Sequence, residues 1–410
     1  MLNYTLNLYR SSYGGLSQNT WWLALVMFVN RSGTMVVPFM TMYMTQQLGV
    51  GIAKAGFVMS LFGAGAIIGA LIGGKVTDKI GFHKVQLFTL FGGGIMFFVL
   101  GQMKSYSAIC VTIFFLSMVN EAFRPANSVA VAHYSKDENR TRSYSLNRLA
   151  VNLGWAFGSA LGGLIASFNY ELLFWVDGCT NIAGAILLFV VLGPVQRKNT
   201  TAEKQESPEI VKKQSAYKDG PYIFFIFLTI LFAICFFQFF TILPVFYKTV
   251  FHLSELFIGV NMAINGLIIA FFEMVIVFKL EGRRPSVHYM AIGILLVGIS
   301  YLILNLPLES AVFIAMSSVV MVTLGEIFAM PFMNAYWISR TSPHNRGEYA
   351  ALYTVAWSSA QAIGPFFGAQ VAASRGYPTL WWIVGIMSLV LSVAYWFIQK
   401  QKLPDQDLME

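Results

Sequence analysis

The stretch Gly65–Val85, GAIIGALIGGKVTDKIGFHKV, decides the fold. Its first half is apolar and carries Gly65, Gly69 and Gly73 at four-residue spacing, which gives a helix a flat strip for close packing of a second helix. Its second half is a basic loop with a turn glycine, Gly81. An apolar helix that ends in a basic loop is typical of a membrane span that reaches the cytoplasmic surface.

Apolar runs of this kind occur twelve times along the chain. A helix needs about 20 apolar residues to cross a hydrocarbon core of about 30 Å. The predicted spans form two sets of six: 21–44, 54–76, 85–103, 107–132, 147–168 and 172–193, then 222–247, 256–279, 287–306, 311–338, 349–372 and 379–398. The fold class that follows is an all-α membrane protein with twelve transmembrane helices in two six-helix halves.

The second set repeats landmarks of the first at an offset near 206 residues. The matching positions are Asn139-Arg140 with Asn345-Arg346, Gly158-Ser159 with Gly364-Pro365, Gly162 with Gly368, and Pro38 with Pro244. An offset near 203 pairs Asp78 with Glu281. Parallel six-helix repeats are a recurring transporter plan, with the substrate site near the midplane where the halves meet.

Composition and charge agree with a membrane protein. The 410 residues are 57% hydrophobic and 11% charged, with a mean hydropathy of +0.64, which leaves too little polar surface for a soluble globule. Of 27 Lys and Arg residues, two lie inside spans away from their ends, four lie in or at the outer loops, and the other 21 lie in the loops, tails and span ends of the opposite side. This bias predicts a multi-pass protein of the cell inner membrane with both termini cytoplasmic. The net charge of +8 then faces lipid headgroups, and no nucleic acid is expected.

The predicted domains are an N-terminal half, 1–193, a cytoplasmic linker, 194–220, and a C-terminal half, 221–410. The linker, PVQRKNTTAEKQESPEIVKKQSAYKDG, mixes charges of both signs with few apolar residues. We therefore expect a solvated tether between the halves.

The loop after the second span resembles the major facilitator superfamily, whose loop between helices 2 and 3 carries a Gly-x-x-x-Asp-basic-x-Gly pattern. Four residues match it: Gly74, Asp78, Lys79 and Gly81. The resemblance implies a conformational motif in which Asp78 faces the N-terminal end of a neighbouring helix and latches the outward-open state. Phe82 stands where a basic residue is usual in the family.

The fifth span contains NLGWAFGSALGG, which resembles the Gly-x-x-x-Gly-Pro-x-x-Gly-Gly pattern of drug and proton antiporters. Gly154, Gly158, Gly162 and Gly163 match, whereas Ser159 replaces the proline. Such a strip permits close helix contact and a bend, so it fits a packing role as well as antiport. We assign Gly158 and Gly162 to the conformational motif.

Six charged residues lie inside predicted spans and away from their ends: Arg31, Glu121, Arg124, Asp177, Glu273 and Glu326. A charge at the centre of a span costs about 2.5 to 3.5 kcal/mol on insertion scales, so each needs a partner, a cavity or a function. Glu121 and Arg124 share one helix face. In the superfamily, helices 1, 4, 7 and 10 line the central cavity, which implies that Arg31 approaches these two residues. Asn30 and Asn120 are expected to complete a hydrogen-bonded cluster.

This arrangement predicts an anion site and a proton site. Two arginines against one glutamate leave a positive surplus that suits a carboxylate, although a structural ion pair between helices 1 and 4 is an alternative. Glu326 has no basic residue in its span and is the best proton carrier. Glu121, Asp177 and Glu273 are further proton-coupling candidates, and the last two also fit structural acids.

A second resemblance is to proton-dependent oligopeptide transporters. It rests on Asn30-Arg31, the run Arg124-Pro125-Ala126-Asn127-Ser128, Asn152-Leu153-Gly154, and Glu326 followed by Pro331. That family has Glu-x-x-Glu-Arg in helix 1, where Met27 and Asn30 stand here in place of both glutamates. Peptide uptake is therefore an alternative prediction.

Aromatic residues add to the expected site. Four phenylalanines surround Gln238 in helix 7, and Tyr336 and Trp357 lie in helices 10 and 11; rings that face inward would suit an amphipathic organic substrate, and rings that face outward contact lipid. The predicted substrate contacts are Arg31, Asn30, Asn120, Arg124, Gln238, Tyr336 and Trp357.

No enzyme site, metal site or cofactor is expected. The five histidines lie at loops or span ends, the three cysteines lie in separate spans, and no Gly-Lys-Ser/Thr phosphate loop occurs. The prediction is a monomeric, proton-coupled secondary transporter of small amphipathic organic molecules, working by alternating access like a drug/proton antiporter. The alternative is proton-coupled uptake of small peptides or organic anions, and a channel is a third possibility.

Overall fold

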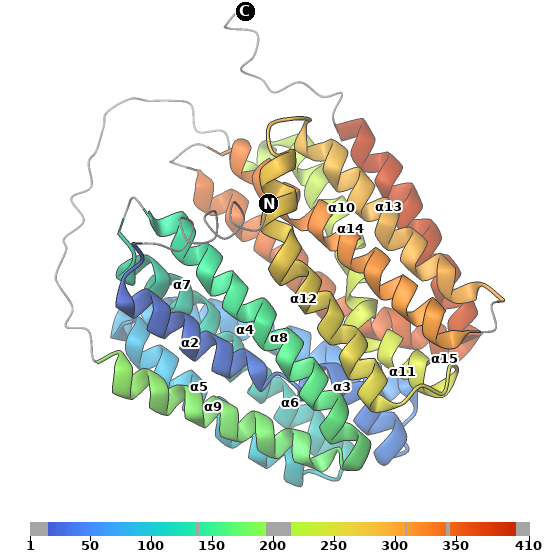
Figure 1. The fold of residues 1–410 in the computed structure, drawn as a ribbon, viewed down its shortest axis with the longest axis horizontal. Coiled ribbons are helices and arrows are strands. Elements are labelled where there is room, and N and C mark those ends of the chain that lie inside the picture. Colours follow the sequence, from blue (N-terminus) through green and yellow to red (C-terminus); the bar gives the residue numbers. More distant parts are fainter. Residues whose placement is uncertain (1–14, 137–138, 194–214, 308–309, 342–344, 399–410) are drawn as a thin grey trace, which may run out of the picture. The chain divides into compact units, whose positions relative to one another are not determined.

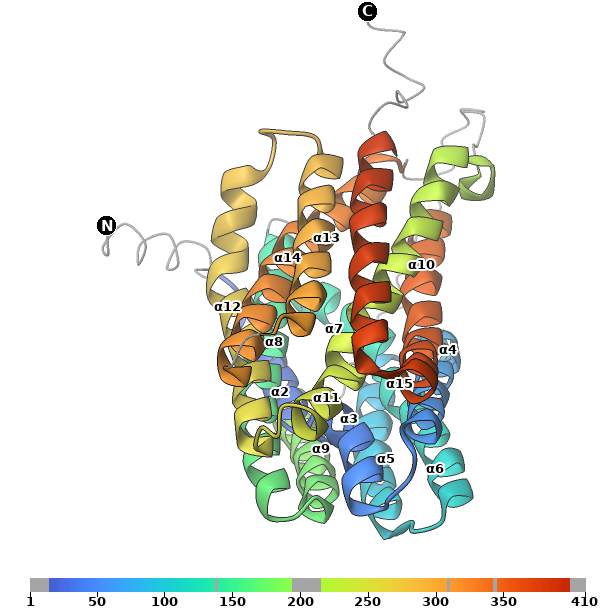
Figure 2. The same ribbon diagram turned by 90° about the vertical axis from the view of Figure 1, so that its right-hand side faces the viewer.

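The computed structural model describes residues 15–136, 139–193, 215–307, 310–341 and 345–398, and within these ranges every regular element is helical (Figures 1 and 2). The helices before the linker are α2 (Gln18–Ser32), α3 (Val36–Met42), the π-helix η1 (Tyr43–Gln47), α4 (Ile52–Ile80), α5 (Phe82–Gln102), α6 (Tyr106–Glu121), α7 (Phe123–Tyr134), α8 (Arg140–Phe168) and α9 (Glu171–Val191). Those after it are η3 (Ala216–Lys218), α10 (Gly220–Thr241), α11 (Leu243–Thr249), α12 (Glu255–Leu280), α13 (Ser286–Leu302), η4 (Ile303–Asn305), α14 (Ala311–Ser339) and α15 (Arg346–Ile398).

Eleven helical segments in the described ranges are long and apolar enough to cross a membrane. They coincide with the predicted spans to within a few residues, except that the last two, 349–372 and 379–398, both fall in α15. Gly376 interrupts α15 with a φ of 80°, a conformation that glycine adopts readily. Most of the predicted linker, 194–214, lies outside the described residues.

The described residues form two compact units. The first contains residues 15–48, 61–193 and 254–270, and the second contains 49–60, 215–253 and 271–398. The start of α4 thus groups with the second unit and the start of α12 with the first, so the predicted boundaries at 193 and 221 stay a prediction.

In the first unit, α2 packs against α8 and α9, and α5 packs against α6, α7 and α9 (Figure 1). The glycine strip of α4 lies against the backbone of α6, where Gly69 faces Met118 and Gly73 faces Ala122. A side chain at either glycine would overlap that backbone, which confirms the close packing predicted from the spacing.

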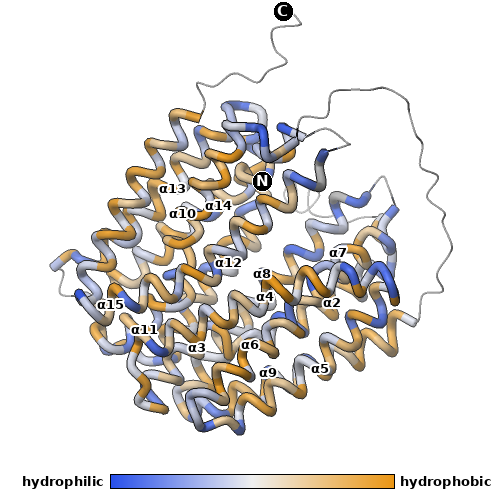
Figure 3. Tube along the Cα trace, turned by 180° about the vertical axis from the view of Figure 1, so that it is seen from behind, coloured by the Kyte–Doolittle hydropathy of each residue, from blue (hydrophilic) through white to orange (hydrophobic). Residues whose placement is uncertain are grey.

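In the second unit, α13 packs between α14 and α15, and α10 also packs against α15 (Figure 2). Fully buried Trp381 stacks on Tyr301 with ring centroids 5.6 Å apart. Figure 3 shows hydrophobic residues along the bodies of the helices and hydrophilic residues gathered toward their ends, as expected of segments surrounded by lipid.

Candidate functional site

The first, fourth and seventh spans are each interrupted ahead of a proline. α2 and α3 separate before Pro38, α6 and α7 before Pro125, and α10 and α11 before Pro244. Proline has no N–H to pair with the carbonyl four residues earlier, so the helix loses a hydrogen bond at that point. Irregular backbone inside a membrane is stable only where other protein groups satisfy it or where it borders a cavity. The breaks therefore mark where a site is expected.

Three of the predicted charges meet at two of these breaks. Glu121 is the last residue of α6, is buried, and forms an ion pair with Arg124, in which Glu121 Oε2 and Arg124 Nε are 2.6 Å apart. Arg31 lies in the last turn of α2 and interacts electrostatically with both Glu121 and Arg124. The Arg31 Nε atom is buried and has no hydrogen-bond partner within the described ranges. The cluster thus carries two positive charges and one negative charge.

The glycines of α8 hold this end of α2 in place. An added Cβ at Gly154 would lie 2.6 Å from Arg31 Cβ, and one at Gly158 would lie 2.8 Å from the carbonyl oxygen of Ser32. A Cβ added at Gly162 would lie 3.1 Å from Met35, the N-cap of α3, and 3.0 Å from Phe39 of α3. The antiporter-like pattern therefore acts here as a packing surface for the broken first span.

Asn30 and Asn120 lie on other interfaces. Asn30 Nδ2 donates to Asn181 Oδ1 of α9 at 2.9 Å, while the Asn120 amide lies against Gly93 of α5. The hydrogen-bonded cluster expected of these two asparagines with the charges is therefore not the arrangement that the structure shows. As substrate contacts, both stay predictions.

Asp177 of α9 is fully buried and caps the start of α3. Its carboxylate accepts hydrogen bonds from Met35 N at 3.0 Å and from Val36 N at 2.8 Å. These are N–H groups that the broken helix leaves unpaired, so the geometry matches the structural role left open for Asp177.

In the second unit, Gln238 joins α10 to α15. Its Nε2 donates to the carbonyls of Ile234 and Gly364, both at 2.8 Å, and its side chain is fully buried against Gly368. Both hydrogen bonds of the Gln238 amide N–H groups are thus made within the protein, one inside α10 and one to α15. A substrate contact at Gln238 stays a prediction.

The predicted aromatic residues fall into two groups in this unit. The Trp357 ring lies 6.1 to 6.2 Å from the rings of Phe232, Phe236 and Phe237. The Tyr336 ring lies 4.7 Å from that of Phe225 and 5.7 Å from the Arg340 guanidinium.

The two remaining predicted acids differ in their surroundings. Glu326 is partly buried in α14, next to Gly325, whose added Cβ would lie 2.6 Å from the side chain of Val297 in α13. Glu273 of α12 is 5% exposed, between Phe272 and Met274, which are 56% and 53% exposed. Both acids have interactions in the structure.

The sequence prediction missed a buried ion pair at the start of α10. Asp219 caps α10 by accepting from Tyr222 N at 3.1 Å, and it binds Arg340 through two hydrogen bonds of 2.9 and 2.7 Å. Tyr349 OH donates to it as well, at 2.9 Å. Burial alone would raise the pKa of Asp219, but the hydrogen bonds from Arg340 and Tyr349 and the arginine charge outweigh burial and lower it. The readable signal was Asp-Gly-Pro directly before an apolar run, an N-cap signature.

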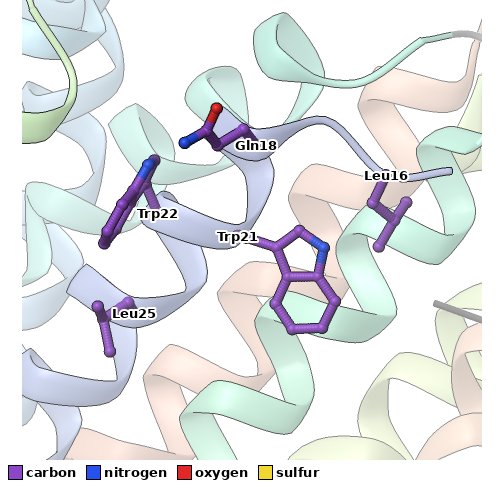
Figure 4. Close-up of a pocket in the computed structure, with 5 residues that line it drawn as sticks. All are labelled: Leu16, Gln18, Trp21, Trp22 and Leu25. Carbon is purple, nitrogen blue, oxygen red and sulfur yellow. The ribbon is translucent and has the colours of Figure 1, made fainter. Parts of the chain in front are cut away.

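A surface pocket of about 550 Å³ lies at the start of α2 (Figure 4). Leu16, Trp21, Trp22 and Leu25 line it with Gln18 as its one polar residue, and the two indoles point to different sides of the helix. Arg31 lies nine residues beyond Trp22, which is about 14 Å along a helix. The pocket has the composition of a membrane-interface region and lacks the charges of the site described above.

The family model for the Major Facilitator Superfamily matches residues 21–365, with a second match over residues 290–408. The chain belongs to the major facilitator superfamily. Its relatives are transporters, which are not enzymes. Among the described residues, no group of three or more His, Cys, Asp or Glu is placed to hold a metal ion.

Several relatives match nearly the whole chain. The uncharacterized MFS-type transporter YttB of Bacillus subtilis is 24% identical over 381 residues, which is 90% of this chain and 91% of the relative. A Na⁺, Li⁺, K⁺/H⁺ antiporter of Planococcus maritimus is 23% identical, with 90% and 92% covered. The quinolone resistance protein NorA of Staphylococcus aureus is 19% identical over 44% of this chain and 46% of its own.

Solved structures agree with this fold. A POT family transporter in complex with 5-aminolevulinic acid aligns with a TM-score of 0.77 at 18% identity, with 94% of this chain and 96% of that chain covered. The nucleoside transporter NupG aligns with a TM-score of 0.73 at 17% identity, with 94% and 100% covered. At such identities the likeness concerns the fold alone.

The superfamily loop between α4 and α5 departs from the family pattern for a visible reason. Gly81 has a φ of 88° and is the N-cap of α5, while Asp78 and Lys79 are exposed. Asp78 forms no ion pair with any residue that the structure describes. Phe82 is buried, and its ring lies 5.1 Å from that of His133 and 5.9 Å from that of Tyr134. An aromatic contact thus stands where the family usually has a basic residue. A Cβ added at Gly74 would lie 4.0 Å from Pro125 Cβ.

Proposed function

We propose that this protein is a proton-coupled secondary active transporter of small amphipathic organic molecules, working by alternating access in the manner of a drug/proton antiporter, and that its substrate carries an anionic group. The observation that carries the proposal is the cluster of Arg31, Glu121 and Arg124, in which the buried Nε of Arg31 has no partner in the described part of the chain.

The charge balance of this cluster favours an anionic ligand. Glu121 is already engaged by Arg124, so its carboxylate is not fully available to Arg31. A buried polar donor without a partner costs about 1 to 3 kcal/mol, and more when it is charged. A substrate carboxylate would supply the missing acceptor, and the planar guanidinium fork matches carboxylate geometry.

The remaining features support the amphipathic and proton-coupled parts. The rings around Trp357 offer an apolar surface, and Glu326 is a partly buried acid in a span without basic residues. One relative, matched over 90% of this chain, is named as a cation/proton antiporter. Another relative, matched over 44% of this chain, is named for quinolone resistance.

A second candidate is proton-coupled uptake of small peptides or organic anions. The same positive surplus favours it, because peptides and organic anions carry carboxylates. The two candidates predict opposite substrate movement under one imposed pH gradient, so transport in proteoliposomes separates them.

The proposed membrane arrangement has twelve spans in a cell inner membrane, with both termini cytoplasmic and a monomeric protein. α15 has 53 residues, about 80 Å of helix at 1.5 Å per residue, and a core of about 30 Å cannot contain it as one span. We therefore propose that α15 consists of two membrane spans that meet at Gly376. The distribution of 21 basic residues against four supports the proposed orientation.

The test is binding of an anionic amphiphile and of its neutral ester to purified protein. Arg31→Gln should weaken binding of the anion by about 10- to 100-fold, the size of a charge-assisted hydrogen bond, and leave the ester unchanged. Arg31→Lys keeps the charge but loses the planar guanidinium fork. Its affinity for the anion should lie between that of the wild type and that of Arg31→Gln.

A double variant separates anion binding from simple ion pairing. If Arg31 only neutralises Glu121, Arg31→Gln with Glu121→Gln should restore what either single change damages. If Arg31 holds the substrate anion, the double variant should fold and still fail to bind. Recovery of affinity in the double variant would overturn the proposal.

A further inference from the structure

A groove of about 760 Å³ runs between α5 and α9 on the first unit, away from the charge cluster. Eight residues line it, and seven of these are apolar. Phe88 and Phe91 form its α5 wall, and Ile186 and Phe189 form its α9 wall; all four are more than half exposed, from 52% for Phe91 to 71% for Phe88. In Figure 3 both helices are hydrophobic along most of their length.

The one polar lining residue of this groove is Lys84. Lys84, Phe88 and Phe91 are four and three residues apart and so share one face of α5. Seven residues of helix place Phe91 about 10 Å from Lys84 along the helix axis. That spacing takes the groove from the headgroup level, where lysine is stable, into the acyl region of one leaflet.

Lys84 has no counter-ion among the residues that the structure describes. Its side chain is exposed. It also lies in the first turn of α5, whose N-cap, Gly81, offers no side-chain hydrogen bond. A positive residue at the positive end of a helix is electrostatically unfavourable. An anion beside Lys84 would neutralise the lysine charge and also interact favourably with the N-terminal end of α5. In the adjoining last turns of α4, Lys75 and Lys79 outnumber Asp78.

We propose that this groove binds one anionic phospholipid, with the phosphate of the headgroup at Lys84 and an acyl chain between Phe88 and Phe189. Charge complementarity selects the occupant. Basic residues at the membrane surface attract anionic lipids, and exposed phenylalanines beyond them match an acyl chain. A second copy of this chain would bring another Lys84 or another basic loop to the same place, and like charges would repel.

The experiment uses the full chain in lipid nanodiscs that contain equal amounts of phosphatidylglycerol and phosphatidylcholine. Native mass spectrometry after gentle release measures which lipid stays bound. The wild type should retain phosphatidylglycerol preferentially. Lys84→Gln should lower that preference about fivefold, equivalent to about 1 kcal/mol, the usual contribution of one basic residue near an anionic surface. Phe88→Ala should lower retention of both lipids.

The matched control is Lys279→Gln. Lys279 is also exposed in the terminal turn of a span, α12, and follows the 75% exposed Phe278, but it does not line the groove. The Lys279→Gln variant should therefore retain the two lipids in the same ratio as the wild type. A second readout is Phe88→Trp, whose fluorescence should be quenched more by bromine-labelled phosphatidylglycerol than by labelled phosphatidylcholine.

Three results would overturn the proposal. The first is an unchanged ratio of bound phosphatidylglycerol to phosphatidylcholine in Lys84→Gln. The second is a loss of phosphatidylglycerol preference in Lys279→Gln as large as that in Lys84→Gln. The third is a dimer mass that disappears with Phe88→Ala, which would identify a second copy as the occupant. None of these results bears on Arg31, so the proposal stands or falls separately from the transport function.

Discussion

Replacing Asp219 by Asn should destabilise the protein by about 3 kcal/mol. The side chains of Asp219 and Arg340 are 5% and 7% exposed, so the substitution leaves a buried guanidinium without its counter-ion. Removing one partner of a buried pair costs about 3 to 5 kcal/mol. The lower end applies here because asparagine still caps α10. Asp219→Ala, which also loses the cap, should cost about 1 kcal/mol more.

The assay is urea unfolding in mixed micelles, compared with the exposed pair of Lys104 and Glu171. Their side chains are 58% and 44% exposed, so Lys104→Gln should cost less than about 1 kcal/mol. Combining Asp219→Asn with Arg340→Gln should recover part of the loss, because no charge is then left unpaired. An effect of Asp219→Asn no larger than that of Lys104→Gln would refute this account of the buried pair.

The same substitution has a defined pH dependence. The folded pKa of Asp219 is lowered, so its stabilising contribution is fully present above the unfolded value of about 3.9 and is lost as pH falls through the folded pKa. The pKa of Arg340 is raised above its already high value, because the bond to Asp219 outweighs burial, so Arg340 stays charged. The difference between wild type and Asp219→Asn should therefore be constant from pH 5 to 8 and shrink below about pH 4.

Three further predictions concern transport and packing. Glu326→Gln should abolish accumulation driven by an imposed pH gradient in proteoliposomes while substrate counterflow persists; unchanged accumulation would remove Glu326 from proton coupling. Asp78→Asn should shift the resting population toward the inward-open state with little loss of affinity, seen as changed distances between spin labels on the two membrane faces. An unaltered distance distribution would reduce the motif to a topology signal. Gly158→Ala should cost about 1 to 3 kcal/mol, because its Cβ would lie 2.8 Å from the carbonyl oxygen of Ser32, whereas Gly184→Ala, with its nearest neighbour at 3.9 Å, should be near neutral; equal midpoints in urea would contradict this.

Features that depend on local spacing were predictable from the sequence. Four-residue glycine spacing predicts a close helix contact wherever the partner lies, and the strip of α4 does meet α6 at Gly69 and Gly73. The proximity of Arg31 to Glu121 and Arg124 was also expected, through the superfamily resemblance. In both cases the information lies within one helix or in a known order of helices.

Features that depend on long-range contacts were not predictable. Asp219 and Arg340 are 121 residues apart, and Arg340 alone looks like any basic residue at a cytoplasmic boundary. Asn30 is adjacent to Arg31 in sequence, yet it bonds to Asn181 in α9. Gln238 lies in a span that is apolar on all sides, so periodicity gives no indication of which face meets α15.

The duplication accounts for the backbone of the candidate site better than for its chemistry. At the offset of 206, Pro38 matches Pro244, and both follow a helix break. Arg31, in contrast, corresponds to Phe237, and Glu326 corresponds to Asn120. An unused charge inside a span costs about 2.5 to 3.5 kcal/mol, so a charge that occurs in only one repeat is not explained by the shared fold. The proposal assigns anion binding to the first half and proton coupling to the second. It therefore depends on positions such as Arg31 and Glu326, where the two repeats differ.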